Sequence, residues 1–165
     1  MPICGTSEKS SPVNGASKFP DPTDRLVRRI AEVGEIAPDS IGDMMEFRVV
    51  SGEPEAGIYT LHCRTFPWMR NAAGTLHGGM CATIVDQAMG FLAYCAKPGE
   101  GRAPTVQLQL TYHRPLIPGE EVDVQVRLVS VSKSLMHLSA EAALTASPEK
   151  LCLSASAAYF YKPTE

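Results

Sequence analysis

The sequence has no strong excess of one charge and no long run of basic residues. Its 15 Lys and Arg residues stand against 18 Asp and Glu residues, which gives a formal net charge of -3, and no long run of Lys and Arg occurs. A chain that binds the phosphate backbone of a nucleic acid gathers positive charge along one segment or on one face. The sequence therefore predicts no nucleic-acid partner.

Uninterrupted apolar runs are also missing. The longest apolar stretch, residues 80–96, contains Asp86 and Gln87, whereas a membrane-spanning helix needs about 20 predominantly apolar residues. Residues 1–17 lack the apolar centre of a secretory signal. We expect no membrane association and a cytoplasmic location.

Paired cysteines and metal-binding spacings are absent as well. The five cysteines are odd in number, scattered and mostly set among apolar neighbours, which is typical of free thiols in a reducing compartment. No CxxC pair occurs, and the spacings of His62, His113 and His137 do not match known metal motifs. We expect no disulfide framework, no metal and no cofactor.

The chain of 165 residues is long enough to form one domain with its own hydrophobic core. Residues 1–20 are rich in Ser, Gly and Pro, which predicts a disordered tail before a single domain over 21–165. The domain opens with a short amphipathic helix that Thr23 or Asp24 can cap and that ends near Gly34. Its apolar stripe consists of Leu26, Val27, Ile30 and Val33.

Six segments have the composition of β-strands. Residues 44–50 and 58–65 flank a turn cluster and predict a hairpin. Residues 105–112 alternate regularly and predict a half-buried strand; its apolar positions are Val106, Leu108, Leu110 and Tyr112. The remaining strands are expected at 121–129, 135–146 and 151–161, and their short connections predict antiparallel pairing of neighbours.

Residues 80–96 are apolar on nearly every side when wound at 3.6 residues per turn, which predicts a fully buried helix. Asp86 inside it is costly to bury without a partner or a function, and Gly78 and Gly79 leave the helix start open to a ligand. One long buried helix with about six antiparallel strands predicts an α+β fold. The curved sheet must wrap around the helix, in a hot-dog-like layout.

The ordered set Asn71-x-x-Gly74-x-x-His77-Gly78-Gly79, with Asp86 nine residues after the His and Thr105 opening a strand, resembles the PaaI-like hot-dog thioesterases. The similarity runs from about residue 44 to residue 161. It implies hydrolysis of acyl-CoA thioesters by a homodimer or homotetramer with active sites at the dimer interface.

The resemblance also implies a role for each residue of the set. Asp86 is the catalytic acid, acting as general base or nucleophile, and thioester hydrolysis does need such a group. The amides of Gly78 and Gly79, at the start of the helix, bind the carbonyl oxygen as it gains charge. His77 and Asn71 orient the reacting groups through hydrogen bonds. The Thr105 hydroxyl holds the attacking water.

The sequence says less about which residues contact the CoA and the acyl ends of the substrate. Lys133 and Ser134 match a Gly-Arg or Gly-Lys turn that contacts CoA phosphate in relatives, although Ser132 replaces the glycine, and Arg114 is a second candidate. Gln107 replaces an Asp that many relatives carry. The acyl pocket is expected to suit an aryl or medium-length chain and to involve Trp68, Met69, Met80, Met89 and Phe91.

Two other functions stay open. A hot-dog hydratase or dehydratase would need an acid and a His in a short Asp-x-x-x-x-His-type segment, and none occurs near the helix. A non-catalytic acyl-CoA binding protein would keep the fold without the reacting groups, which the joint presence of Asp86, Gly78 and Thr105 argues against.

The spacing of the set predicts that each active site is shared between two chains. Asp86 lies eight residues after Gly78, which is about 12 Å along a helix and too far for both to serve one carbonyl. We expect Asn71, His77 and Gly78 of one chain to work with Asp86 and Thr105 of its partner.

Overall fold

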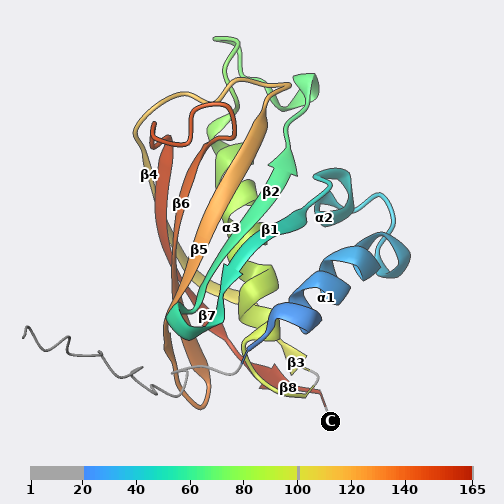
Figure 1. Cartoon of the computed structure of the whole chain (residues 1–165). Coiled ribbons are helices and arrows are strands. Elements are labelled where there is room, and N and C mark those ends of the chain that lie inside the picture. The colour runs from blue at the N-terminus through green and yellow to red at the C-terminus, as the bar shows by residue number, and fades with distance from the viewer. Residues whose placement is uncertain (1–20, 100, 165) are drawn as a thin grey trace, which may run out of the picture.

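The computed structural model describes residues 21–99 and 101–164, so the predicted tail over 1–20 lies outside the described residues. A six-stranded antiparallel sheet curls around one long helix, α3 (Gly78–Cys95), as Figure 1 shows. The expected α+β hot-dog arrangement is therefore confirmed. The strands are β1 (Arg48–Glu53), β2 (Ile58–Arg64), β4 (Thr105–Tyr112), β5 (Glu121–Val131), β6 (Leu135–Leu144) and β7 (Leu153–Phe160).

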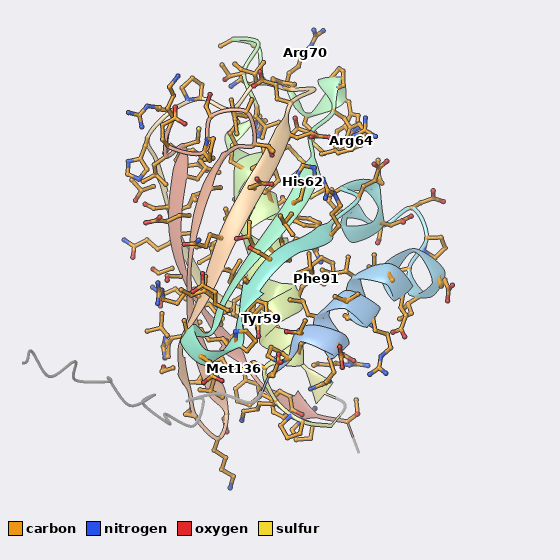
Figure 2. The ribbon with its side chains drawn as sticks, viewed as in Figure 1. Tyr59, His62, Arg64, Arg70, Phe91 and Met136 are labelled. Atoms are coloured by element: carbon orange, nitrogen blue, oxygen red, sulfur yellow. The ribbon has the colours of Figure 1, made fainter. Side chains whose placement is uncertain are left out.

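Helix α3 is buried around most of its circumference because its residues are apolar on nearly every side. Nine of its side chains are buried, and each contributes roughly 1.5–3 kcal/mol when it is a large apolar group. The helix begins two residues before the predicted start and ends at Cys95, just before Lys97, Pro98 and Gly99. Figure 2 labels three core side chains, Tyr59 on β2, Phe91 on α3 and Met136 on β6.

The predicted amphipathic helix is α1 (Thr23–Ile36), which lies beside the C-terminal half of α3 in Figure 1. Two details of the prediction are wrong. Val27 is half exposed, and only Leu26 and Ile30 of the stripe are fully buried. Neither Thr23 nor Asp24 caps the helix; Asp21 accepts hydrogen bonds from the amide and hydroxyl of Thr23 instead. A short helix, α2 (Ile41–Met44), follows and was not predicted.

The sheet has the order β1-β2-β5-β6-β7-β4. The hairpin of β1 and β2 and the antiparallel neighbours β5, β6 and β7 agree with the sequence prediction. The prediction fails for β4 and β5, which are neighbours in the chain but not in the sheet. Strand β4 crosses over to pair with β7, and β5 pairs with β2. A two-stranded sheet of β3 (Gly101–Arg102) and β8 (Lys162–Pro163) was not predicted.

Strand β4 forms one edge of the sheet, and this position changes its burial. Of its predicted inward positions, Leu108 and Leu110 are partly buried, whereas Val106 and Tyr112 are 62% and 54% exposed. The pairing with β7 shifts register between Thr105 and Gln107, so the regular alternation breaks at Val106. The prediction of a half-buried strand is wrong for the isolated chain, and an apolar edge strand is left uncovered.

The four described cysteines, Cys63, Cys81, Cys95 and Cys152, are buried free thiols. The absence of a disulfide framework among the described residues agrees with the pattern of cysteines in the sequence. No helix of residues 21–99 and 101–164 is long and apolar enough to cross a membrane. The cytoplasmic location stays a prediction.

Candidate active site

Asp86 lies at the middle of α3, where the helix faces β4 and β7. One of its carboxylate oxygens, Oδ1, accepts a hydrogen bond of 2.9 Å from the Thr105 hydroxyl and one of 2.8 Å from the Tyr159 hydroxyl. The Tyr159 hydroxyl also lies 3.0 Å from the Asp86 carbonyl oxygen. Two hydroxyl donors therefore fix the rotamer of the carboxylate.

The other carboxylate oxygen of Asp86, Oδ2, has no hydrogen-bond partner among the described residues. Asp86 lines a surface hollow of about 260 Å³ together with Thr105 and Tyr159, so this oxygen is within reach of water or a ligand. Burial, and then the neighbouring Asp86 carboxylate, raises the pKa of the Tyr159 hydroxyl. Tyr159 consequently remains a donor throughout the physiological pH range.

Tyr159 is a site residue that sequence reasoning missed. It is 73 residues from Asp86 in the chain and lies on β7, in a strand that was predicted without any assignment of its polar groups. The only signal in the sequence is a tyrosine in a strand of mostly small residues, whose hydroxyl needs a partner when it is buried. That signal does not reveal which partner it finds.

Gly78 begins α3, about 12 Å from Asp86 along the helix axis. Its amide belongs to the first helical turn and has no hydrogen-bond partner among the described residues. Its carbonyl oxygen accepts a hydrogen bond of 2.8 Å from the hydroxyl of Tyr112, a second residue that sequence reasoning missed. The hollow next to Gly78, of about 380 Å³, is lined by Asn71, Tyr112 and Arg114 among others.

Asn71 organises the turn that leads into α3. Its side-chain oxygen accepts hydrogen bonds from the amides of Ala73 and Thr75, and its side-chain nitrogen donates to the Thr75 hydroxyl. Gly74 completes the turn with a positive φ of 85°, which a residue with a side chain adopts only under strain. The side-chain nitrogen of Asn71 has two hydrogens, so one of them is not used by the bond to Thr75.

His77 is the residue before α3, and its ring caps the helix. Its Nδ1 accepts a hydrogen bond of 3.0 Å from the Gly79 amide, so the neutral ring carries its proton on Nε2. The Gly79 amide is thus already occupied in this structure, which leaves Gly78 as the free amide of the predicted pair. His77 is exposed and does not line the Gly78 hollow.

The structure divides the predicted site residues into three groups. Asp86 and Thr105 share one hollow, whereas Asn71, Gly78 and Arg114 share another. Lys133 and Ser134 form a third group in the turn between β5 and β6, near the end of α3, where the Lys133 carbonyl accepts a hydrogen bond from the Lys97 side chain. Within the part of the chain that the structure describes, Asp86 and Gly78 line two different hollows.

Among the residues expected to form the acyl pocket, only Phe91 lines the Asp86 hollow. Met69 and Met89 are buried in the core, Met80 packs partly against it, and Trp68 is half exposed. The Arg114 guanidinium donates to the Leu151 carbonyl at 2.8 Å, so it is partly engaged within the chain.

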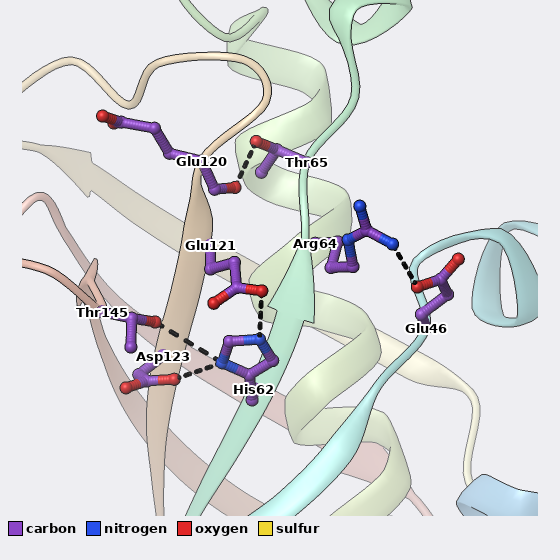
Figure 3. Close-up of polar contacts among 8 residues, drawn as sticks. All are labelled: Glu46, His62, Arg64, Thr65, Glu120, Glu121, Asp123 and Thr145. Atoms are coloured by element: carbon purple, nitrogen blue, oxygen red, sulfur yellow. Dashed lines mark hydrogen bonds and ion pairs between the residues drawn. The ribbon is translucent and has the colours of Figure 1, made fainter.

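A separate buried histidine lies on β2, away from both hollows. His62 is 2% exposed, and Figure 3 shows its ring between the side chains of Asp123 and Glu121. Its Nδ1 is 2.8 Å from Asp123 Oδ1, whereas its Nε2 is 3.7 Å from Glu121 Oε1 and makes no hydrogen bond. This cluster links β2 to β5.

Over residues 21–99 and 101–164 no group of His, Cys, Asp and Glu has metal-binding geometry, and the lack of a metal stays a prediction.

Comparison with known sequences finds a similarity in the central part of the chain. Residues 73–144 match the family model described as the thioesterase superfamily. The human acyl-coenzyme A thioesterase 13 is 34% identical over 73 residues, which cover 43% of this chain and 50% of the relative. The chain thus spans about half the length of the curated relatives it matches.

Comparison with solved structures shows the fold. The Escherichia coli PaaI protein from the phenylacetic acid degradation operon superposes with a TM-score of 0.68 at 13% identity, covering 85% of this chain and 98% of that one. A Streptococcus mutans protein bound to acetyl CoA superposes with a TM-score of 0.61 at 20% identity, covering 72% and 91%. These matches confirm the fold that the sequence resemblance implies.

Proposed function

Because the chain has the fold of the PaaI-like hot-dog proteins and its residues 73–144 match the thioesterase superfamily, we propose that it is an acyl-CoA thioesterase. It hydrolyses an aryl- or medium-chain acyl-CoA to the free acid and CoA. The observation that carries the proposal is the Asp86 carboxylate, which has one oxygen held by two hydroxyls and the other without a partner among the described residues, in a hollow. The names of the curated relatives support the same activity.

The geometry of Asp86 suits either of two roles in hydrolysis. As a general base, its Oδ2 takes a proton from a water that the Thr105 hydroxyl helps to hold, while the water oxygen attacks the carbonyl carbon. As a nucleophile, the same oxygen attacks that carbon, and water hydrolyses the resulting anhydride. In both routes the carbon–sulfur bond breaks, and CoA leaves as a thiolate that then takes up a proton.

The carbonyl oxygen needs a donor as negative charge develops on it. The Gly78 amide is suited to this role because it is the first amide of α3, points out of the helix and has no described partner. The second hydrogen of the Asn71 side-chain amide is a further donor in the same hollow. His77 acts indirectly, because its ring holds the Gly79 amide and fixes the start of the helix.

The separation of the two hollows supports a shared site in a homodimer, or in a homotetramer built from such dimers. Asp86 and Thr105 of one chain then meet Asn71 and Gly78 of its partner, with the two α3 helices antiparallel. The exposed apolar side chains Val106 and Tyr112 on edge strand β4 favour pairing of this edge with a second copy. Such pairing would cover the edge and continue the sheet.

The lining of the Asp86 hollow supports an aryl or medium-length acyl group. Phe91, Tyr94 and Val33 supply apolar surface there, and Gly90 leaves room beside the carboxylate. The proposed contacts for the phosphates of CoA are Lys133, Ser134 and Arg114. Within one chain, Lys133 and Ser134 lie in the turn between β5 and β6, whereas Arg114 lines the Gly78 hollow.

Release of free thiol from a panel of acyl-CoAs tests the proposal. Wild type should turn over aryl or medium-chain substrates, and Asp86→Asn should lose about 10²- to 10⁴-fold in kcat because the amide accepts no proton. Glu141→Gln is the matched control, since it removes an equal charge from an exposed position of β6. Equal rates for wild type and Asp86→Asn would contradict the mechanism. Tight acyl-CoA binding by wild type without any turnover would favour a binding protein instead.

A further inference from the structure

A strongly basic hollow lies next to the Asp86 hollow, at the junction of α1 with the end of α3. It measures about 470 Å³ and contains one acidic residue against three basic ones; it is lined by Arg25, Arg28, Arg29, Glu32, Tyr94 and Gly99. We call it the arginine hollow. The chain as a whole has a net charge of -3, so this positive site is a local feature.

The arginine hollow and the Asp86 hollow share two of their lining residues. Arg29 and Tyr94 border both, and the Arg29 guanidinium carbon lies 4.4 Å from the centre of the Tyr94 ring. The two hollows are therefore adjacent parts of one surface, with the carboxylate in one part and the arginines in the other. Tyr94 is eight residues after Asp86 on α3, which is about 12 Å along the helix.

The three arginines are not equally available. Arg25 is already used by the fold, because its guanidinium donates to the carbonyl oxygens of Cys95, Lys97 and Gly99 and so covers the end of α3. Arg28 has only a 3.8 Å contact with Glu32, and both side chains are largely exposed. Arg29 stacks on Tyr94 and donates no hydrogen bond to any described residue. Arg28 and Arg29 thus keep their donors for a ligand.

We propose that Arg28 and Arg29 bind an anionic group of the thioester substrate whose carbonyl lies at Asp86. This inference rests on the proposed function. Guanidinium groups bind phosphate and carboxylate through paired hydrogen bonds, and a partly buried, aromatic-backed arginine loses little freedom when it does so. Because Tyr94 lies about 12 Å along α3 from Asp86, an anion beside Tyr94 lies on the order of 12 Å from the reacting carbonyl.

Two parts of the substrate span this distance and end in an anion. One is the pantetheine arm of CoA, which leads to the phosphates. The other is an acyl chain with a carboxylate at its far end. The Lys97 side chain, which donates to the Lys133 carbonyl, lies at the same end of α3 and adds positive charge there. Both sources share the chemistry of an oxyanion bound by arginine, and kinetics separate them.

The test compares Arg28→Gln, Arg29→Gln and the double variant with wild type on four thioesters. Two acyl groups are used, one neutral and one that ends in a carboxylate. Each is attached either to CoA or to pantetheine, which lacks the phosphates. The double variant should raise KM about tenfold for the substrates that carry the bound anion, with kcat nearly unchanged. Glu32→Gln should lower the same KM, since it removes the competing charge from the hollow.

Arg127→Gln is the matched control, because it removes an exposed arginine from β5, outside the arginine hollow. A KM increase for CoA esters that disappears with pantetheine esters identifies the phosphates as the anion. An increase confined to carboxylate-ended acyl groups identifies the acyl carboxylate. Unchanged KM for all four thioesters in the folded double variant would overturn the inference while leaving the thioesterase intact.

Failure of the proposed function gives a different result. If wild type hydrolyses no thioester, calorimetry with CoA and with a carboxylate-ended acyl-pantetheine replaces the kinetics. Binding that is weakened in the double variant and not in Arg127→Gln then supports the anion site alone. No difference between these variants would reject it. Arg29→Lys serves as a folding check, since it keeps the charge over Tyr94.

Discussion

At the scale of single residues, the carboxylate of Asp86 depends on Tyr159. The Tyr159 hydroxyl is buried, its pKa is raised by that burial, and it donates to Asp86 from β7. A pattern of residues in the sequence was enough to predict Asp86, Thr105 and Gly78, because those residue types recur at fixed spacing in the family. Tyr159 escapes such reasoning, because its partner is set only when β7 packs on α3.

Tyr159→Phe should lower kcat about tenfold, because the carboxylate loses one of its two fixing hydrogen bonds while the ring still fills its place. KM should change little. Tyr161→Phe is the matched control, since that hydroxyl donates only to the Pro98 carbonyl among the described residues. An unchanged kcat in folded Tyr159→Phe would show that Thr105 alone positions Asp86.

At the scale of elements, the length of α3 separates the proposed catalytic groups of one chain. Gly78 and Asp86 lie two turns apart, in separate hollows, so in the proposed mechanism a single helix presents two half-sites. The helix and all six strands were predictable from the pattern and composition of their residues. The place of β4 was not, because short connections favour pairing of chain neighbours, whereas β4 crosses the sheet to reach β7.

A mixture of Asp86→Ala and Asn71→Ala chains tests the shared site. Each parent should be inactive, and mixing equal amounts should restore about a quarter of the wild-type activity, since half of the dimers are mixed and each contains one intact site. Subunit exchange is checked by native mass spectrometry. Mixed dimers that form and stay inactive would contradict the arrangement.

At the scale of the whole molecule, the buried thiols make the free energy of unfolding depend on pH in the alkaline range. Burial raises the pKa of Cys63 to about 12 and that of Cys81 and Cys95 to about 11. A thiol in an unfolded chain has a pKa of about 8.5. Between these values the unfolded chain loses protons that the folded chain keeps, so the unfolded state is favoured as pH rises.

The contribution of these thiols to the free energy of unfolding should therefore be constant up to about pH 8 and fall between about pH 9 and 11, by about 1.4 kcal/mol per pH unit for each such thiol. Urea titrations at several pH values measure it. Cys63→Ala should lower stability at pH 7, because it leaves a cavity, but should flatten the alkaline slope. An identical slope in both proteins would exclude Cys63 as a source of the pH dependence.

The order of the sheet also bears on how the chain folds. Strands β5, β6 and β7 are consecutive hairpins, so they make local contacts that close small loops quickly. The pairing of β2 with β5 joins residues 58–64 to residues 121–127 and must close a loop that contains all of α3 and β4. Folding should start in the C-terminal meander, and the slow step should be the closure of the N-terminal hairpin over α3.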